Sequence, residues 1–176
     1  MNTKEAILTR QSCRSFTGEQ ISQEECRTLL EAANAAPVAN GAYADVRLTV
    51  IQNEDVLSQM EAVAAQAMPG LGDHPMYGAP TVILVSGKKG DATASALGYC
   101  NASCIIENIL LEAAELGLGS VYLFAVPAVM QAVPELSRAV GIPEDFMPLA
   151  MAAVGRSAGE LQARCPATDK IQTDIL

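Results

Sequence analysis

A short segment near the amino end of the chain concentrates side chains that bind anions. Arg10, Ser12 and Arg14 stand at alternate positions, and in an extended backbone residues two apart project to the same side. One side of the segment would then carry two guanidinium groups and a hydroxyl, a set suited to a phosphate or another anion. Solvated surface patches also show this spacing, so the pattern alone leaves two interpretations open.

Thiols and imidazole offer a second kind of chemistry. The chain has five cysteines, at positions Cys13, Cys26, Cys100, Cys104 and Cys165. Cys100 and Cys104 lie four apart on one face of a predicted helix, yet no second cysteine pair follows and the single histidine, His74, is distant. We therefore expect no metal site and two buried, reduced thiols there, because free cysteine is among the most buried residue types. We expect His74 to be a solvated loop residue, and we find no set of residues for acid–base or nucleophilic catalysis.

The hydrophobic pattern predicts the elements that would carry these residues. A capping box at residues 22–25 opens one helix, and Pro37 ends it. Gly and Pro mark a loop over residues 69–78, which we expect to line the mouth of a pocket. The predicted helices cover residues 3–9, 22–36, 55–68, 91–116, 127–133 and 134–140, and the predicted strands 45–52, 80–87, 120–124 and 149–155. This order predicts one α+β domain, a three-layer sandwich in which helices flank a mixed central sheet.

The longest predicted helix is apolar around most of its circumference between residues 104 and 114. A helix of this kind belongs in the interior of an assembly. We expect it at the centre of a homodimer, and the alternative is the centre of a monomeric core. The polar residues 156–176 show little periodicity and predict an extended tail.

Composition excludes several classes of protein. The chain has 176 residues, of which 50% are hydrophobic and 18% charged, and its net charge is −9. Disorder is excluded by the apolar content, and binding to nucleic acid or to acidic membranes is disfavoured by the charge. No apolar run reaches the roughly 20 residues of a membrane span. Residues 1–10 lack the apolar region of a secretory signal, so we expect a cytoplasmic protein.

Four motifs in order resemble the nitroreductase family. The family patterns are R-R-S-x-R-x-F, A-P-S-A-x-N, Q-N-L-L-L-A-A-x-x-L-G-L-G-S and a closing V-G-x with R-x-P. The matching segments of this chain are R-Q-S-C-R-S-F at 10–16, A-A-P-V-A-N-G at 35–41, E-N-I-L-L-E-A-A-E-L-G-L-G-S-V at 107–121, V-G-R at 154–156 and R-C-P at 164–166. Each motif is weak alone, but their shared order spans most of the chain.

The resemblance implies one FMN-binding domain over residues 1–176. Arg10, Ser12 and Arg164 would hold the FMN phosphate, and Arg14 would contact the N1–O2 edge of the ring. The other cofactor-binding residues that the resemblance implies are Gln11, Pro37, Val38, Asn40, Tyr122, Leu123 and Phe124. Residues 37–40 would lie against the ribityl chain or the partner's flavin, and the backbone of residues 122–124 would pass N5. The tail, residues 156–176, would wrap the second subunit.

The resemblance also implies an activity. The flavin would carry the chemistry, taking a hydride from NAD(P)H at N5 and passing electrons to a nitroaromatic, a quinone or a similar acceptor in ping-pong order. Val38 replaces a common Ser, Ala42-Tyr43-Ala44 replaces Q-P-W, and Gln11 replaces an Arg. Reductive dehalogenation, flavin fragmentation, flavin binding without catalysis, and thiol chemistry at Cys100 and Cys104 are the alternatives.

Overall fold

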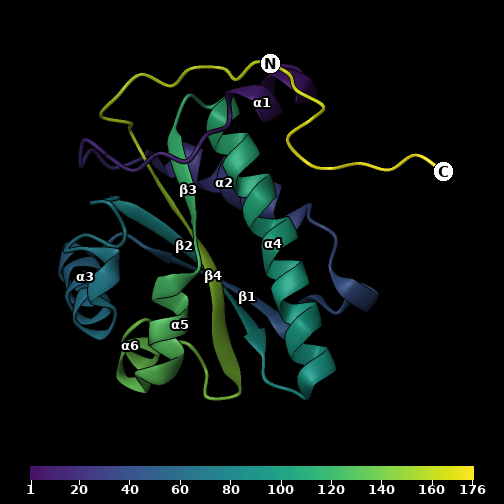
Figure 1. Ribbon diagram of the computed structural model, residues 1–176. Helices are drawn as coiled ribbons and strands as arrows, with labels where there is room; N and C mark the ends of the chain where they lie inside the picture. The colour runs from purple at the N-terminus through teal and green to yellow at the C-terminus, as the bar shows by residue number, and fades with distance from the viewer.

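Four strands form the centre of the computed structural model, which describes residues 1–176 (Figure 1). Their order across the sheet is β1-β2-β4-β3. The strands are β1 (Val46–Ile51), β2 (Thr81–Lys88), β3 (Gly119–Leu123) and β4 (Phe146–Gly155). Central strands β2 and β4 are buried on both faces, as expected for a sheet covered by helices on each side.

The prediction of a mixed sheet is wrong for strands β1 to β4, which contain no parallel pair. All three strand pairs are antiparallel. The helix and loop between β1 and β2 return the chain to the end of the sheet that it left, which leads to antiparallel pairing. The only parallel pairing is a single bridge between Ser12 and Ser120.

Helices cover both faces of this sheet, which confirms the three-layer α+β sandwich (Figure 1). On β2, Ile83 and Val85 belong to one buried cluster, whereas Val82 and Leu84 belong to the other, because successive side chains of a strand point to opposite faces. The first cluster packs under α2 (Gln23–Asn34) and α4 (Ala92–Glu115), and the second under α3 (Glu54–Ala67), α5 (Ala125–Ala132) and α6 (Pro134–Ala139).

Helix α4 buries one side within its own chain. Buried residues include Ile105, Ile109 and Ala113, whereas Cys100 and Cys104 are exposed. The prediction that both cysteines are buried is therefore wrong, because the sheet takes the side of the helix that carries the isoleucines. The helix α1 (Thr3–Thr9) packs against α4, and short 3-10 turns occur at Ala39–Gly41, Tyr43–Asp45 and Pro69–Leu71.

Most element boundaries lie within two residues of the prediction, and two of the differences have a structural cause. Strand β4 begins at Phe146 rather than 149, because Pro148 is accommodated opposite Ser86, where the register of β2 and β4 shifts. Helix α5 begins at Ala125, so Phe124 is its N-cap residue rather than the end of a strand.

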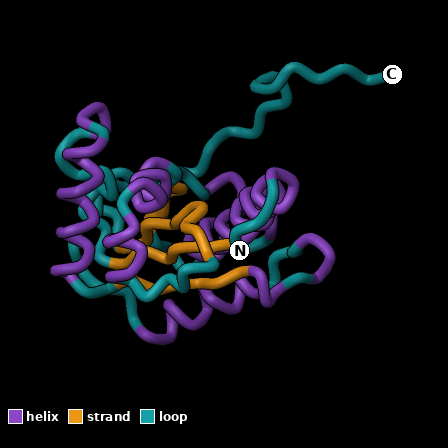
Figure 2. Tube along the Cα trace, turned by 90° about the horizontal axis from the view of Figure 1, so that it is seen from below, coloured by secondary structure: helices purple, strands orange, loops and turns teal.

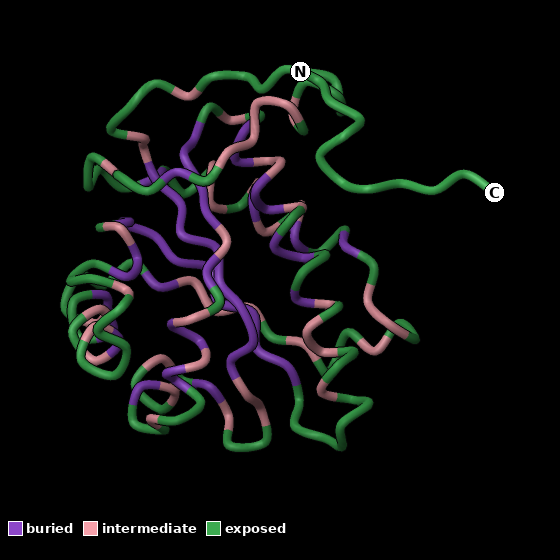
Figure 3. Tube along the Cα trace, in the orientation of Figure 1, coloured by how far each residue is buried: buried purple, intermediate pink, exposed green.

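Beyond β4 the chain contains no further helix or strand. Residues 162–176 are all exposed, and the end of the chain leaves the body of the molecule in both views (Figures 1 and 2). Figure 3 shows the contrast between this exposed tail and the buried strands. No helix combines the length and the apolar character needed to cross a membrane.

Candidate functional site

The arginine-rich segment, residues 10–16, is held in extended form beside the edge strand β3. The backbone N–H of Cys13 donates to the carbonyl of Ser120 at 2.9 Å, next to the bridge between Ser12 and Ser120. Phe16 forms a second bridge with Ser157, just after β4. The segment is thus fixed at its middle by a backbone bond to the sheet and at its carboxyl end by pairing with the chain that leaves the sheet.

Side chains of this segment alternate as the sequence predicts. Cys13 is 6% exposed, whereas Ser12 and Arg14 are exposed. The Cys13 thiol donates to the carbonyl of Ser15 at 3.1 Å, and its sulfur lies 2.8 Å from where a Cβ on Gly119 would stand. Cys13 therefore packs inward against β3, away from the face that carries Arg14.

The hydrogen-bond donors of this segment are largely unused. The Nε atom of Arg10 lies 3.5 Å from Oε1 of Glu107 on α4, at a side-chain exposure of 21% for the arginine. Neither Arg10 nor Arg14 makes a side-chain hydrogen bond, and Arg14 has no carboxylate within 4.0 Å. The Nε2 amide of Gln11 is buried without an acceptor. Two guanidinium groups and one amide are thus available to an acceptor-rich ligand.

Arg164 comes to this place from the other end of the chain. Its backbone N–H donates to the carbonyl of Leu8 at 2.8 Å, and its Nη2 donates to the carbonyl of Ile7 at 2.6 Å. Both carbonyls lie in the last turn of α1, where a cation is favoured and where Arg10 follows directly. The structure therefore brings Arg164 to the carboxyl end of α1, which Arg10 follows directly.

Arg156 is engaged elsewhere. Its Nη1 lies 2.8 Å from Oε1 of Glu25, and its Nε lies 3.8 Å from Oε1 of Glu19. The backbone N–H of Ser22 lowers the pKa of the Glu25 carboxyl, with further lowering from the Ser22 side chain and Arg156 and an opposing effect of burial. Arg156 thus anchors the start of α2 and is not among the free cations.

Residues 37–40 lie apart from the arginines within one chain. The N–H of Ala39 donates to Oδ1 of Asn101 at 2.9 Å, and Asn101 precedes Glu107 by six residues, about 9 Å along α4. Asn40 is exposed in a left-handed conformation with φ of 57°, and Val38 packs against the core. Asn40 borders a cavity of about 240 Å³.

Residues 122–124 lie at the edge of the sheet, and two of them, Tyr122 and Phe124, are aromatic. Phe124 is 54% exposed, and its ring lies 6.0 Å from that of Tyr99 on α4. Gln131 donates to the Tyr99 hydroxyl at 3.0 Å, and the hydroxyl of Tyr122 lies 3.4 Å from Oγ of Ser103. Leu123 is buried in the core. Sequence reasoning missed Tyr99 and Gln131, because nothing local connects them to β3.

The loop at residues 69–78 is held against helix α3. Glu61 of α3 accepts from the backbone N–H of Met76 at 3.0 Å and lies 3.2 Å from Nδ1 of His74. These contacts hold the loop on α3, and it lines none of the three principal cavities. His74 has a side-chain exposure of 75%, which confirms it as a solvated loop residue.

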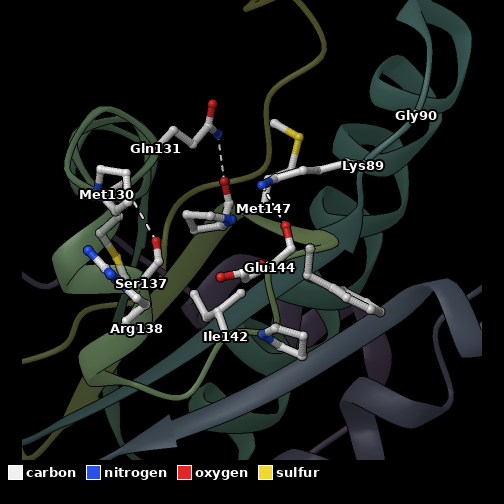
Figure 4. A pocket seen from close by; sticks show the side chains of 13 residues that line it. Lys89, Gly90, Met130, Gln131, Ser137, Arg138, Ile142, Glu144 and Met147 are labelled. Carbon is white, nitrogen blue, oxygen red and sulfur yellow. Dashed lines mark hydrogen bonds between the residues drawn. The ribbon is translucent and has the colours of Figure 1, made fainter.

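A cavity of about 760 Å³ is formed by a different part of the chain (Figure 4). It is bounded by α5, α6 and the start of β4, and it includes Pro148. Ser120, which forms a bridge with Ser12, also pairs with Val154 of β4. Val154 lies six residues, or about 20 Å, beyond Pro148 along this strand, so the cavity is distant from the segment at residues 10–16. Polar groups of this cavity already have partners, since Lys89 Nζ donates to the carbonyl of Glu144 and Gln131 to that of Pro148. The polar groups of the cavity are thus satisfied within the protein, whereas the strip formed by residues 10–14 carries the free donors of Arg10 and Arg14.

No group of three or more His, Cys, Asp or Glu side chains is placed to hold a metal ion. The arrangement of donors instead defines an α+β sandwich protein with an anion-binding strip at the edge of its sheet. The profile of the nitroreductase family matches residues 7–156. The chain therefore belongs to the nitroreductase family and is an oxidoreductase.

Individual relatives agree with this assignment. A protein of Archaeoglobus fulgidus with the provisional name NADH dehydrogenase/NAD(P)H nitroreductase is 29% identical over 153 residues, which cover 85% of this chain and 82% of that protein. A Desulfitobacterium hafniense nitroreductase solved with bound FMN has a TM-score of 0.84 and 25% identity, over 99% of this chain and 100% of its own. A Bacteroides fragilis nitroreductase, also solved with FMN, matches in fold with a TM-score of 0.81 and 23% identity, over the whole of both chains.

Proposed function

We propose that this chain is an FMN-dependent oxidoreductase that passes electrons from NAD(P)H to an electron-poor acceptor such as a nitroaromatic or a quinone. The observation that carries the proposal is the strip at residues 10–14, in which Arg10 and Arg14 have no hydrogen-bond acceptor although their backbone is firmly held. Family membership and two FMN-bound relatives of the same fold support this assignment.

The available donors fit the phosphate and the ring edge of FMN. Arg10 and Ser12 would hold the phosphate, and Arg164 would add a second guanidinium from the end of α1. A phosphate offers several acceptor oxygens and up to two negative charges, which matches two guanidinium groups and a hydroxyl. The buried, unpaired Nε2 of Gln11 would gain an acceptor from the same ligand.

Bound FMN would supply an atom, N5, that accepts a hydride and makes the electron pair available to a second substrate. Arg14 would lie at the N1–O2 edge, where its positive charge stabilises the negative charge that reduction creates. The backbone of residues 122–124 would orient the ring without taking or giving a proton. NAD(P)H and the acceptor would occupy the same face in turn, which gives ping-pong kinetics.

A second subunit would complete the site. Residues 37–40 lie away from the arginines of their own chain, which fits contact of Pro37, Val38 and Asn40 with the flavin of a partner. The segment at residues 10–16 is an open strip rather than a cavity, and a homodimer would close it. All five cysteines are free, which fits the reducing cytoplasm.

The test is the absorbance spectrum of the purified protein, followed by release and weighing of the chromophore. We expect FMN at about one copy per chain, bleached by NADH or NADPH and restored by a quinone or a nitroaromatic. A colourless protein that does not take up added FMN would contradict the proposal. A yellow protein that never oxidises NAD(P)H would indicate flavin binding without this catalysis.

A further inference from the structure

One carboxylate stands beside Arg10 of the strip. Oε1 of Glu107 lies 3.5 Å from Nε of Arg10, with side-chain exposures of 52% and 21%. Arg14 and Arg164 have no carboxylate within 4.0 Å. Arg164 is instead held by the neutral carbonyls of Ile7 and Leu8. Glu107 is thus the single acidic group that directly offsets the positive charge of this strip.

The contact between Glu107 and Arg10 is an ion pair without a hydrogen bond. The geometry at 3.5 Å does not satisfy hydrogen-bond criteria, and no other acceptor bonds the Arg10 side chain. An arginine and a carboxylate in a strong pair form two short parallel bonds, which this pair does not. The carboxylate therefore occupies the neighbourhood of Arg10 without using its donors, and a phosphate would compete for the same cation.

We propose that Glu107 sets the affinity of this site for a phosphate-bearing flavin by competing with the phosphate for Arg10. The inference rests on the proposed function, because it assumes that Arg10 holds the phosphate of FMN. Glu107 sits within α4, whose backbone is packed against the sheet, so the helix keeps this residue next to the strip when a ligand binds. Two negative groups then share one cation, and the repulsion between them weakens binding.

This competition acts on the phosphate alone. Riboflavin has the same ring and ribityl chain but no phosphate, so Glu107 should leave its affinity unchanged. The carboxylate of Glu107 therefore lowers the ratio of the affinity for FMN to the affinity for riboflavin. Its effect should also fall as salt rises, because both groups are partly exposed and salt screens exposed charges.

The experiment compares the wild-type protein, stripped of flavin, with the variant Glu107→Gln. Dissociation constants for FMN and for riboflavin are measured by quenching of flavin fluorescence at low and at high salt. We expect FMN to bind the variant about three- to tenfold more tightly at low salt, the range of a repulsion near 1 kcal/mol. Riboflavin affinity should stay within about twofold, and the gain for FMN should shrink at high salt.

The matched control is Glu115→Gln. Glu115 lies about two turns further along α4 and contacts the amino group of Met1 rather than an arginine of the strip. This variant should bind both flavins as the wild type does. Unchanged or weaker FMN binding by Glu107→Gln would overturn the inference, as would an equal gain for riboflavin. Wild-type protein that binds no FMN at all would instead contradict the proposed function.

Discussion

At the scale of single residues, availability of donors distinguishes the arginines of this chain. Arg156 and Arg138 are paired with carboxylates at 2.8 and 2.7 Å, the first at the start of α2 and the second within α6. Arg14 projects from a rigid backbone with no partner of any kind. The donors of Arg14 are therefore free for a ligand, which supports the proposed flavin site.

Substitution Arg14→Ala should separate ligand binding from stability. The exposed side chain makes no protein contact by charge or hydrogen bond, so the melting temperature of the flavin-free protein should stay within about 2 °C. Loss of a charge-assisted bond to the ring should weaken FMN about tenfold or more. Calorimetry and flavin titration measure the two effects. Arg27→Ala, which removes an exposed arginine paired with Glu31, is the control and should leave FMN binding unchanged.

At the scale of elements, the strip depends on a close approach between the segment at residues 10–16 and strand β3. A Cβ on Gly119 would stand 2.8 Å from the Cys13 sulfur and 3.2 Å from Cβ of Ser157. The absence of a side chain at Gly119 therefore allows the backbone of Cys13 to bond that of Ser120. The positions of Ser12 and Arg14 follow from that contact.

Substitution Gly119→Ala should push the segment away from β3. We expect a loss of about 1–3 kcal/mol in the free energy of unfolding, as for overpacking elsewhere, together with weaker FMN binding. In the double variant Cys13→Ala/Gly119→Ala the closest clash is gone. Its loss of stability, measured by denaturant unfolding, should be smaller than the sum of the two single losses. Strict additivity would show that the sulfur does not cause the strain.

The start of helix α2 should contribute a pH-dependent share of stability. Glu25 accepts from the backbone N–H of Ser22 at 2.7 Å and pairs with Arg156, so its pKa is lowered below the usual 4.5 in the folded protein. The stabilisation is present above pH 4.5 and disappears as the pH falls through the lowered value. Glu25→Ala should therefore cost about 1 kcal/mol near neutral pH, and the deficit should shrink in acid.

Thermal unfolding of Glu25→Ala between pH 7 and pH 3 checks this prediction. Glu24→Ala is the control, because Glu24 lies in the same first turn without a side-chain hydrogen bond or ion pair. A deficit in Glu25→Ala that is constant across the pH range would show that the carboxyl contributes through packing rather than through its charge.

At the scale of the whole molecule, one chain leaves apolar groups uncovered at its end. Ile171, Ile175 and Leu176 are all exposed, and the tail that carries them projects from the body (Figure 2). Apolar side chains grouped on an arm of this kind gain free energy when a second molecule covers them. This arrangement supports the proposed homodimer.

Removal of residues 168–176 should weaken the dimer and leave Arg164 in place. Sedimentation equilibrium should show a dimer for the full chain and a dissociation constant at least about tenfold larger for the shortened one. A full-length variant with Ile171, Ile175 and Leu176 changed to serine should behave like the shortened chain. Full-length protein that sediments as a monomer at every concentration would contradict the proposed assembly.

Local features of the sequence determined the elements of this protein and the chemistry of its strip. Capping residues at Asn2 and Ser22 mark the starts of two helices where the structure has them. Alternation at residues 10–14 predicted that Ser12 and Arg14 share one side of the segment, and both are exposed. The order of the motifs predicted the nitroreductase family, and the match of residues 7–156 to the profile of that family confirms it. These features depend on neighbours within a few positions, so a sequence carries them directly.

Tertiary structure alone decided the features that depend on residues far apart in the chain. The antiparallel direction of every strand pair follows from the end of the sheet at which each connection returns. The exposure of Cys100 and Cys104 follows from which side of α4 packs against the sheet. Arg164 reaches α1 across 156 positions, Arg156 is taken by Glu25, and Glu107 faces Arg10. Such pairings depend on packing of the whole chain, because a side chain's partner is set by which surfaces are buried together and not by its own neighbours.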